Sequence, residues 1–239
     1  MKIIEFVNKI TNSAFLYRDG LFSSPGRVYT FVNPYSYHLV RNNENLYNKF
    51  DGIFVDGITM CWWMKLLWNN KIPRLSFDMT SIAKDLFNYL NTNNSKTIYF
   101  IGAHQEEIEE SIAHIIKSYP KINLAGYQNG YFLNETHRSN IIDEIVAKNP
   151  DYVIVGMGSP LQEQFLLDLK SRGFKGIGFT CGGFLHQTKD DINYYPKWID
   201  KYNLRAFYRL FHEKGLYKRL YNVLIQFPVL FIYDKFFEK

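Results

Sequence analysis

The residues best placed to do chemistry lie in Asp151–Glu163, which reads as a strand, a turn and the start of a helix. Tyr152–Val155 is a β-branched run typical of a buried parallel strand, and a turn containing Gly156 and Gly158 follows it. Such a turn leaves free backbone N–H groups beside the positive end of a helix, which suits a phosphate. An ordinary βα turn, whose glycines only let the chain bend, gives the same pattern.

The helix expected after this turn carries its own start signals. Ser159 is placed as an N-cap, Pro160 fits the first helical position, and Gln162 sits where a capping box has Glu or Gln. Gln162 and Glu163 therefore face either the sugar end of a bound anion or only the N-terminus of their own helix.

Three further polar residues follow expected strands or precede expected helices. Asp56 ends the strand-like run Phe54-Val55, where a carboxylate is well placed as a general base because a strand end is rigid. The pair Asp56-Gly57 also forms turns that have no catalytic role. Asn33 and Asp78 could each hydrogen-bond a ligand or cap the helix that follows.

No motif indicates a metal site or a covalent nucleophile. Cys61 and Cys181 lack a His or Cys at ligand spacing, there is no Ser-His-Asp set, and no Asp-x-Asp pair suggests a divalent ion on a nucleotide sugar. The lone His186 is interpreted as structural or peripheral. With no signal-peptide pattern, the two cysteines suit a reducing cytoplasm, and no run reaches the roughly 18 apolar residues that span a bilayer.

Charge is distributed unevenly along the 239 residues. The net charge is +5, and all of this excess lies in residues 196–239, so that residues 1–195 are neutral overall. With 18 Tyr and 20 Phe, aromatic residues are also abundant, and these usually gather in binding clefts or at membrane interfaces. The composition indicates a neutral binding or catalytic body with a basic appendage.

Strand and helix patterns alternate at least five times before residue 180. This predicts an α/β fold with a Rossmann-like, mostly parallel sheet, helices on both faces, and ligands beyond the carboxyl ends of the strands. The expected strands are 28–32, 51–55, 97–101, 122–125, 152–155 and 176–179, and the expected helices are 34–48, 59–68, 79–90, 105–118, 135–148 and 160–171. Residues 1–26 show no period and are expected to be a loosely structured lead-in.

Residues 1–192 are predicted to be the α/β domain, and residues 193–239 a C-terminal helical, basic and aromatic appendage. Its first expected helix carries a basic residue every four positions, at Lys197, Lys201, Arg205 and Arg209. Steps of four drift by only about 40° around a helix, so these residues form one stripe. The second helix, about 216–227, adds Arg219 and an aromatic run. This suits an anionic membrane surface, although a helical pair packed on the body has the same pattern.

Taken together, these motifs resemble the WecG/TagA/CpsF family of bacterial glycosyltransferases over residues 28–230. The matching segments are Asn33-Pro34, Asp56-Gly57, Gly130-Tyr131-Phe132, Val155–Glu163, Pro196-Lys197-Trp198 and Leu204–Leu210. Each segment alone is weak, and their order along the chain carries the resemblance.

The resemblance implies an inverting, metal-independent transfer of a sugar from a UDP-sugar to a polyprenyl-diphosphate-linked acceptor. N-acetylmannosamine, glucose and uronic acid are the implied donor types, and the product belongs to a cell-surface polysaccharide or a teichoic acid. The implied location is the inner face of the cell membrane, with the C-terminal segment on its anionic surface. No cofactor is implied beyond the donor substrate, and a homo-oligomer is left open.

The family's functional residues map onto this sequence. Asp56 is the implied base, Asn33 and Gln162 meet the sugar or acceptor, and the Gly156–Ser159 turn holds the nucleotide. The remaining implied binding residues are Asp78, Gly158, Glu163, Arg205, Arg209 and Arg219, of which the arginines meet the diphosphates. Without a metal, cations and helix N-termini must stabilise the departing UDP.

Two other classes of function share part of this pattern. A non-catalytic nucleotide-binding module of a membrane-bound polysaccharide assembly complex would keep the Gly156–Ser159 turn but needs no base. A nucleic-acid binder is disfavoured, because the neutral body offers little to a phosphate backbone and the basic residues of the tail alternate with bulky apolar groups.

Overall fold

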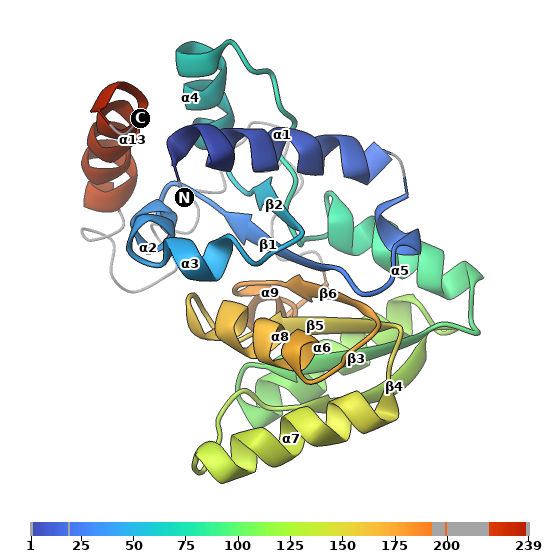
Figure 1. The fold of residues 1–239 in the computed structure, drawn as a ribbon. Coiled ribbons are helices and arrows are strands. Elements are labelled where there is room, and N and C mark those ends of the chain that lie inside the picture. The colour runs from blue at the N-terminus through green and yellow to red at the C-terminus, as the bar shows by residue number, and fades with distance from the viewer. Residues whose placement is uncertain (1, 19, 193–198, 200–219, 238–239) are drawn as a thin grey trace.

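We describe the fold from a computed structural model, which describes residues 2–18, 20–192, 199 and 220–237. Within these residues the chain is an α/β protein with a Rossmann-like, six-stranded, all-parallel sheet in the order β2-β1-β6-β5-β3-β4 (Figure 1). The strands are β1 (Val28–Val32), β2 (Gly52–Val55), β3 (Thr97–Gly102), β4 (Asn123–Gln128), β5 (Tyr152–Gly156) and β6 (Ile177–Thr180). All six expected strands are confirmed to within about three residues.

Helices cover both faces of the sheet, as the alternation of buried side chains along the strands requires. One face is covered by η1 (Leu21–Ser23), α5 (Ile82–Thr92), α6 (Gln105–Ser118) and α9 (Phe184–Gln187). The other is covered by α1 (Ile3–Arg18), α2 (Tyr37–Asn42), α3 (Glu44–Tyr47), α4 (Ile58–Trp68), α7 (Glu135–Lys148), α8 (Leu161–Ser171) and α13 (Phe227–Phe237). On β3, for example, Phe100 packs toward the first set and Ile101 toward the second.

The prediction of a loosely structured N-terminal lead-in is wrong, because α1 is a 16-residue helix. It buries Phe6, Val7 and Ile10 in the same cluster as Ile53 of the edge strand β2. Its buried Ser13 hydroxyl accepts a hydrogen bond from the Ile53 N–H at 2.8 Å. A helix that covers a sheet edge in this way satisfies a strand N–H that would otherwise lack a partner. The buried residues Ile3, Phe6, Val7 and Ile10 have the i, i+3, i+4, i+7 spacing of a helix face, so the sequence did carry a signal for this helix.

The single helix expected over residues 34–48 is also wrong in detail, since two short helices, α2 and α3, replace it. The Oδ1 atom of Asn33 accepts a hydrogen bond from the Ser36 N–H at 3.0 Å, and this turn delays the helix start to Tyr37. The chain then breaks at Asn43, whose φ of −131° is not helical.

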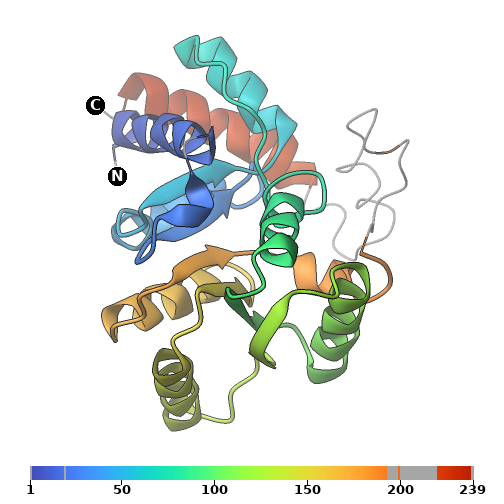
Figure 2. The ribbon, with the colours of Figure 1, turned by 90° about the vertical axis from the view of Figure 1, so that its right-hand side faces the viewer.

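The described part of the C-terminal segment packs closely on the body. It comprises a π-helical stretch, η2 (Asn222–Gln226), which continues into α13. Phe227 and Phe231 of this segment are buried with Tyr37 and Phe6, and Figure 2 shows α13 running beside α1. The carboxylate of Asp234, also buried, pairs with Arg41 at 2.8 Å. The division of the chain at residue 192 stays a prediction.

A close approach of two backbone turns at the carboxyl edge generates the first testable prediction. Gly102 has φ +142°, and a Cβ atom there would lie 2.1 Å from the carbonyl oxygen of Gly156. Gly173 also has positive φ (+97°), but a Cβ atom would meet nothing within 4 Å. We therefore expect Gly102→Ala to lower the free energy of unfolding by about 3 kcal/mol or more, and Gly173→Ala by about 1 kcal/mol.

Urea denaturation of the two variants measures this difference directly, because both glycines carry the cost of positive φ and only Gly102 adds the clash. Equal losses in the two variants would show that the two turns are not tightly apposed.

Candidate active site

The parallel sheet places all the candidate residues of the body at or near one edge, beyond the carboxyl ends of the strands. Val32 of β1 pairs with Val55 of β2, so the residues that follow them, Asn33 and Asp56, are neighbours. A hydrogen bond from the Asp56 N–H to the Val32 carbonyl, 2.9 Å long, joins the two strand ends. The Gly156 turn follows β5 at the same edge.

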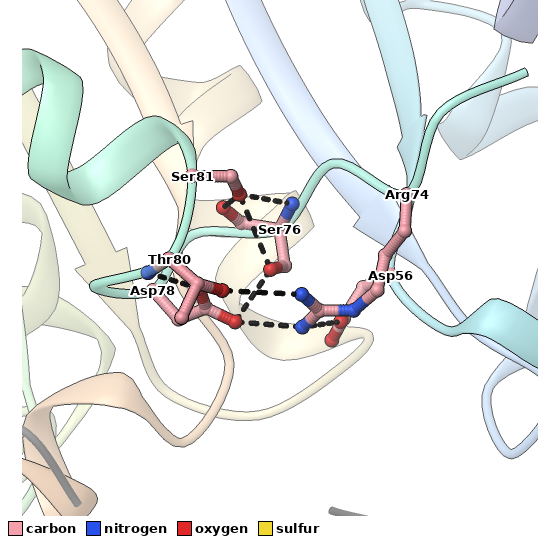
Figure 3. A network of polar contacts seen from close by, with 6 residues as sticks. All are labelled: Asp56, Arg74, Ser76, Asp78, Thr80 and Ser81. Carbon is pink, nitrogen blue, oxygen red and sulfur yellow. Dashed lines mark hydrogen bonds and ion pairs between the residues drawn. The ribbon is translucent and has the colours of Figure 1, made fainter. Parts of the chain in front are cut away.

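Asp56 does not stand alone, because an arginine joins it to Asp78 (Figure 3). One guanidinium nitrogen of Arg74, Nη2, lies 3.0 Å from Oδ1 of Asp56 and 2.6 Å from Oδ2 of Asp78. The three side chains form a carboxylate–arginine–carboxylate bridge in which a single cation faces two anions. No pattern in the sequence indicates Arg74, which lies 18 residues from Asp56.

Backbone contacts position this bridge. The Leu75 N–H donates to the Val55 carbonyl at 2.9 Å, so the segment that carries Arg74 runs along the end of β2. Asp78 is fixed by further donors: the Ser76 hydroxyl at 2.5 Å and the Thr80 N–H at 2.8 Å. The turn around Asp78 precedes α5, which begins at Ile82 with Ser81 as its N-cap and no capping side chain, so Asp78 orders this turn and does not cap the helix.

The bridge has a definite charge balance. Burial works against a charged Arg74, but Asp56 and Asp78 outweigh this effect and raise the pKa of the guanidinium, which stays cationic. The side chain of Asp56 retains 33% of its exposure, so it can be reached from the solvent side while Arg74 holds its orientation. A fixed, accessible carboxylate at a strand end can orient a hydroxyl group and accept its proton.

The Gly156–Ser159 turn rests on a buried polar cluster beneath it. The Oε1 atom of Glu163, whose side chain is 0% exposed, accepts hydrogen bonds from Thr30 at 3.0 Å, Ser159 at 2.9 Å and Gln162 at 3.0 Å. The Thr180 hydroxyl of β6 donates in turn to Thr30 at 3.0 Å. Glu163 thus ties β1, β6 and the helix start of α8 together from inside the protein.

The predicted helix-capping arrangement is wrong. The helix α8 begins at Leu161, its N-cap is Pro160, and no side chain caps it. The Ser159 hydroxyl bonds Glu163 instead, and the Gln162 side chain reaches across to accept from the Gly182 N–H at 3.1 Å. The bond from Ser159 to Glu163 holds the turn after β5. The bond from Gly182 to Gln162 fixes the turn after β6 to the start of α8.

Glu163 lies in the first turn of α8, and its charge state affects any anion bound there. Burial raises the pKa of this carboxyl group, and the hydrogen bonds from Gln162, Ser159 and Thr30 offset that rise only in part. Its second oxygen, Oε2, is buried without a hydrogen-bond partner among the described residues, which also disfavours the negative charge. An environment that disfavours a negative charge on Glu163 leaves the positive end of α8 available to an anion.

Two aromatic side chains stand at the ends of β3 and β4, where the sequence analysis had not placed site residues. The ring of Tyr131 stacks on that of His104, with centroids 4.1 Å apart, and Tyr131 remains exposed. Nearby, Glu107 accepts hydrogen bonds from His186 at 2.7 Å and Lys189 at 3.0 Å. His186 is thus a partner of Glu107 on the surface, in keeping with the peripheral role expected for it.

Several predictions fall on other parts of the chain. Arg205, Arg209 and Arg219 lie outside the described residues, so their roles stay predictions. Cys61 and Cys181 are free and buried, and burial raises the pKa of their thiols to about 11 and about 12, so neither is activated as a thiolate. Across the described ranges, no group of three or more His, Cys, Asp or Glu side chains could hold a metal ion.

Comparisons with known proteins identify the family. A family model described as Glycosyl transferase WecG/TagA/CpsF family matches residues 7–239. The chain belongs to the WecG/TagA/CpsF family. This confirms the resemblance and extends it to the N-terminal helix α1, which the motifs had not covered.

Two relatives of this family show how far the similarity reaches. The UDP-Gal:alpha-D-GlcNAc-diphosphoundecaprenol beta-1,4-galactosyltransferase of Shigella boydii is 38% identical over 205 residues, covering 86% of this chain and 85% of that protein. The N-acetylglucosaminyldiphosphoundecaprenol N-acetyl-beta-D-mannosaminyltransferase of Bacillus subtilis is 27% identical over 202 residues, covering 83% of this chain and 76% of that protein.

The bridge through Arg74 generates the second prediction. Replacing Arg74 by Met leaves two carboxylates facing each other without a cation, and we expect a loss of about 1–3 kcal/mol in the free energy of unfolding at pH 7. The matched control is Arg172→Met, which removes the more exposed pair with Asp143 and should cost at most about 0.5 kcal/mol. Urea denaturation compares the two, and similar losses would contradict the bridge.

The Glu107 cluster generates the third prediction, a dependence of stability on pH. Burial alone would raise the pKa of Glu107, but hydrogen bonds from Lys189, the His104 N–H and His186 outweigh it and lower the pKa to about 2. A carboxyl group with a lowered pKa stabilises the fold above its unfolded pKa of 4.5 and loses this contribution as pH falls toward 2.

We therefore expect Glu107→Gln to be less stable than the natural sequence at pH 7, by about 1 kcal/mol, and the difference to shrink as pH falls below 4.5. Urea midpoints between pH 7 and pH 3 measure this trend. Glu144→Gln, at an exposed pair with Lys148, is the control and should show little dependence on pH. A difference for Glu107→Gln that stays constant with pH would refute the stated cause.

Proposed function

We propose that this protein moves a hexose from a UDP-sugar to a sugar carried on a polyprenyl diphosphate, in the assembly of a cell-surface polysaccharide or a teichoic acid. The names of the two relatives support the substrate classes: both act on a diphosphoundecaprenol-linked sugar, and one takes UDP-Gal. The observation that carries the proposal is the accessible carboxylate of Asp56, held by Arg74 at the same edge of the sheet as the glycine turn after β5.

The strand order supports one direction for the donor. Asp56 follows β2 and the glycine turn follows β5, three strand positions away, which is about 14 Å at the usual spacing. A diphosphate at the Gly156–Ser159 turn therefore puts its sugar toward Asn33 and Asp56. The nucleoside then extends the other way, toward β3 and β4, where the exposed ring of Tyr131 offers a surface for a base to stack on.

In this arrangement the reaction is a single displacement. The carboxylate of Asp56 takes the proton of the acceptor hydroxyl as its oxygen attacks the anomeric carbon, and the bond from that carbon to the UDP oxygen breaks on the opposite side. One displacement inverts the anomeric carbon. The backbone N–H groups at the start of α8 and the arginines Arg205, Arg209 and Arg219 are proposed to stabilise the departing diphosphate.

In this proposal Glu163 and Gln162 support the site from the interior of the protein. Their burial assigns them to holding the turns after β5 and β6, while the backbone of the Gly156–Ser159 turn makes the contact with the donor. Metal independence stays part of the proposal, and turnover that persists in EDTA is its test. The donor sugar is open, and UDP-galactose is the first to try because of the Shigella boydii relative.

The proposed location is the inner face of the cell membrane, where a lipid-linked acceptor is held. None of the helices in the described ranges is long and apolar enough to cross a bilayer. The outward side of η2 and α13 nevertheless exposes a set of large apolar side chains: Leu224, Ile225, Val229, Ile232, Tyr233, Phe236 and Phe237. Such a helix face supports peripheral attachment by the C-terminal segment.

The fourth prediction tests the base. We expect Asp56→Asn to lower acceptor-dependent release of UDP by about 10²- to 10⁴-fold, because the amide cannot take the proton. The assay uses purified full-length protein, a panel of UDP-sugars and N-acetylglucosaminyl diphosphoundecaprenol in detergent. Asp143→Asn, which removes an ion-paired carboxylate on α7 far from the edge, is the control and should leave turnover unchanged.

Binding of UDP by Asp56→Asn, measured by calorimetry, separates a lost base from a lost fold. Near-normal turnover in Asp56→Asn would refute its role. UDP binding by the natural sequence without release from any donor and acceptor pair would favour the non-catalytic nucleotide-binding module instead.

A further inference from the structure

The helix α4, which begins two residues after Asp56, presents an apolar face to solvent. This face has no role in the reaction proposed above. Trp62 is 62% exposed and Leu66 is 72% exposed, although both are large apolar residues. Because they lie four positions apart, they point to the same side of the helix, and Lys65 and Asn69 are exposed on that side too. The opposite side of α4 buries Met60, Cys61 and Met64 in the core.

The charged residues of the segment that carries this face are all basic. Residues 57–77 contain Lys65, Lys71 and Arg74 and no Asp or Glu. Lys65 and Lys71 are both exposed. An exposed tryptophan and leucine flanked by lysines form the pattern by which amphipathic helices settle in the headgroup region of anionic bilayers.

This face lies beside the apolar helix at the C-terminus. The ring of Trp68, at the end of α4, packs on Phe231 of α13 with centroids 5.0 Å apart, and Lys235 of α13 lies 4.7 Å above the same Trp68 ring. Figures 1 and 2 both place α4 and α13 at the same end of the molecule. The exposed apolar side chains of the two helices therefore lie at the same end of the molecule.

We propose that the outward face of α4, formed by Trp62, Lys65 and Leu66, is a second membrane-contact element that enters the headgroup region of an anionic bilayer beside α13. An interfacial helix lies along the plane of the bilayer, so the start of α4 at Ile58 stays near the depth of the rest of the helix. Insertion of this face by the 5–10 Å typical of interfacial helices holds Asp56, at the base of α4, close to headgroup level. That is the depth at which a lipid-linked diphosphate presents its sugar, and this last step rests on the proposed function.

A second copy of the chain fits the outward face of α4 less well than an anionic bilayer does. Two copies that pair symmetrically through α4 would bring Lys65 and Lys71 of one against the same lysines of the other, with no acid in residues 57–77 to balance them. Anionic headgroups supply that balance. The charge of the face thus selects a lipid surface over self-association.

The test measures binding of the full-length protein to vesicles by co-sedimentation, with phosphatidylcholine alone and with added phosphatidylglycerol. The double variant Trp62→Ser/Leu66→Ser should lower affinity for the anionic vesicles by about tenfold or more, since two apolar side chains no longer leave water. Leu133→Ser is the matched control: Leu133 is the most exposed of the large apolar residues that the structure describes, lies just before α7, and should be neutral. Lys65→Gln should weaken binding only to vesicles that carry phosphatidylglycerol.

Unchanged vesicle binding in the double variant would overturn the proposal, and so would a shift from dimer to monomer in size-exclusion chromatography without a change in vesicle binding. Both substituted side chains are exposed, so the thermal midpoint and UDP binding of the double variant should match those of the natural sequence. Vesicle binding requires no sugar transfer, and turnover with acceptor in detergent requires no vesicle. Failure of this inference is therefore distinguishable from failure of the proposed function.

Discussion

The buried carboxyl group of Glu163 is the constraint on which the arrangement of the site depends. It accepts hydrogen bonds from a strand, from the turn after β5 and from its own helix, and the Gln162 side chain beside it holds the turn after β6. A fully buried, hydrogen-bonded carboxyl group permits few geometries, because leaving any of its donors unpaired in the interior carries a desolvation cost. The buried side chains of Glu163 and Gln162 thus set the spacing of the turns at the carboxyl edge, and they need not contact a substrate to do so.

The chemistry proposed for this edge depends on keeping two kinds of charge apart. Asp56 and Asp78 share the Arg74 guanidinium at the β2 end, which leaves one net negative charge there. The β5 end offers the positive end of α8 over a carboxyl group that burial biases toward its neutral form. A donor with a diphosphate at one end and a sugar at the other fits this polarity, because the anion meets the helix start and the sugar meets the carboxylate.

The fold was predictable from the sequence wherever local pattern and packing agree. The strand-turn-helix pattern of residues 151–171 and the limits of α6 and α7 follow from hydrophobic period and turn residues alone. The helix α1 also has this period, at Ile3, Phe6, Val7 and Ile10, but it was missed because the apolar residues Ile4 and Phe15 lie on the solvent side and obscure it. Of the site, Asp56 and the glycine turn carry local signals. Arg74 carries none, since it reaches Asp56 only through the backbone pairing of Leu75 with Val55. The buried role of Glu163 was hidden for the same reason: its partner Thr30 is 133 residues away.

The most direct test of this account is amide hydrogen–deuterium exchange of the full-length protein with and without UDP. We expect UDP to slow exchange most at the start of α8 and in the Gly156–Ser159 turn, with a smaller effect around His104 and Tyr131. The outward face of α4 should show no change. Slowed exchange confined to other parts of the chain, with the start of α8 unaffected, would contradict a donor site at the carboxyl edge of the sheet.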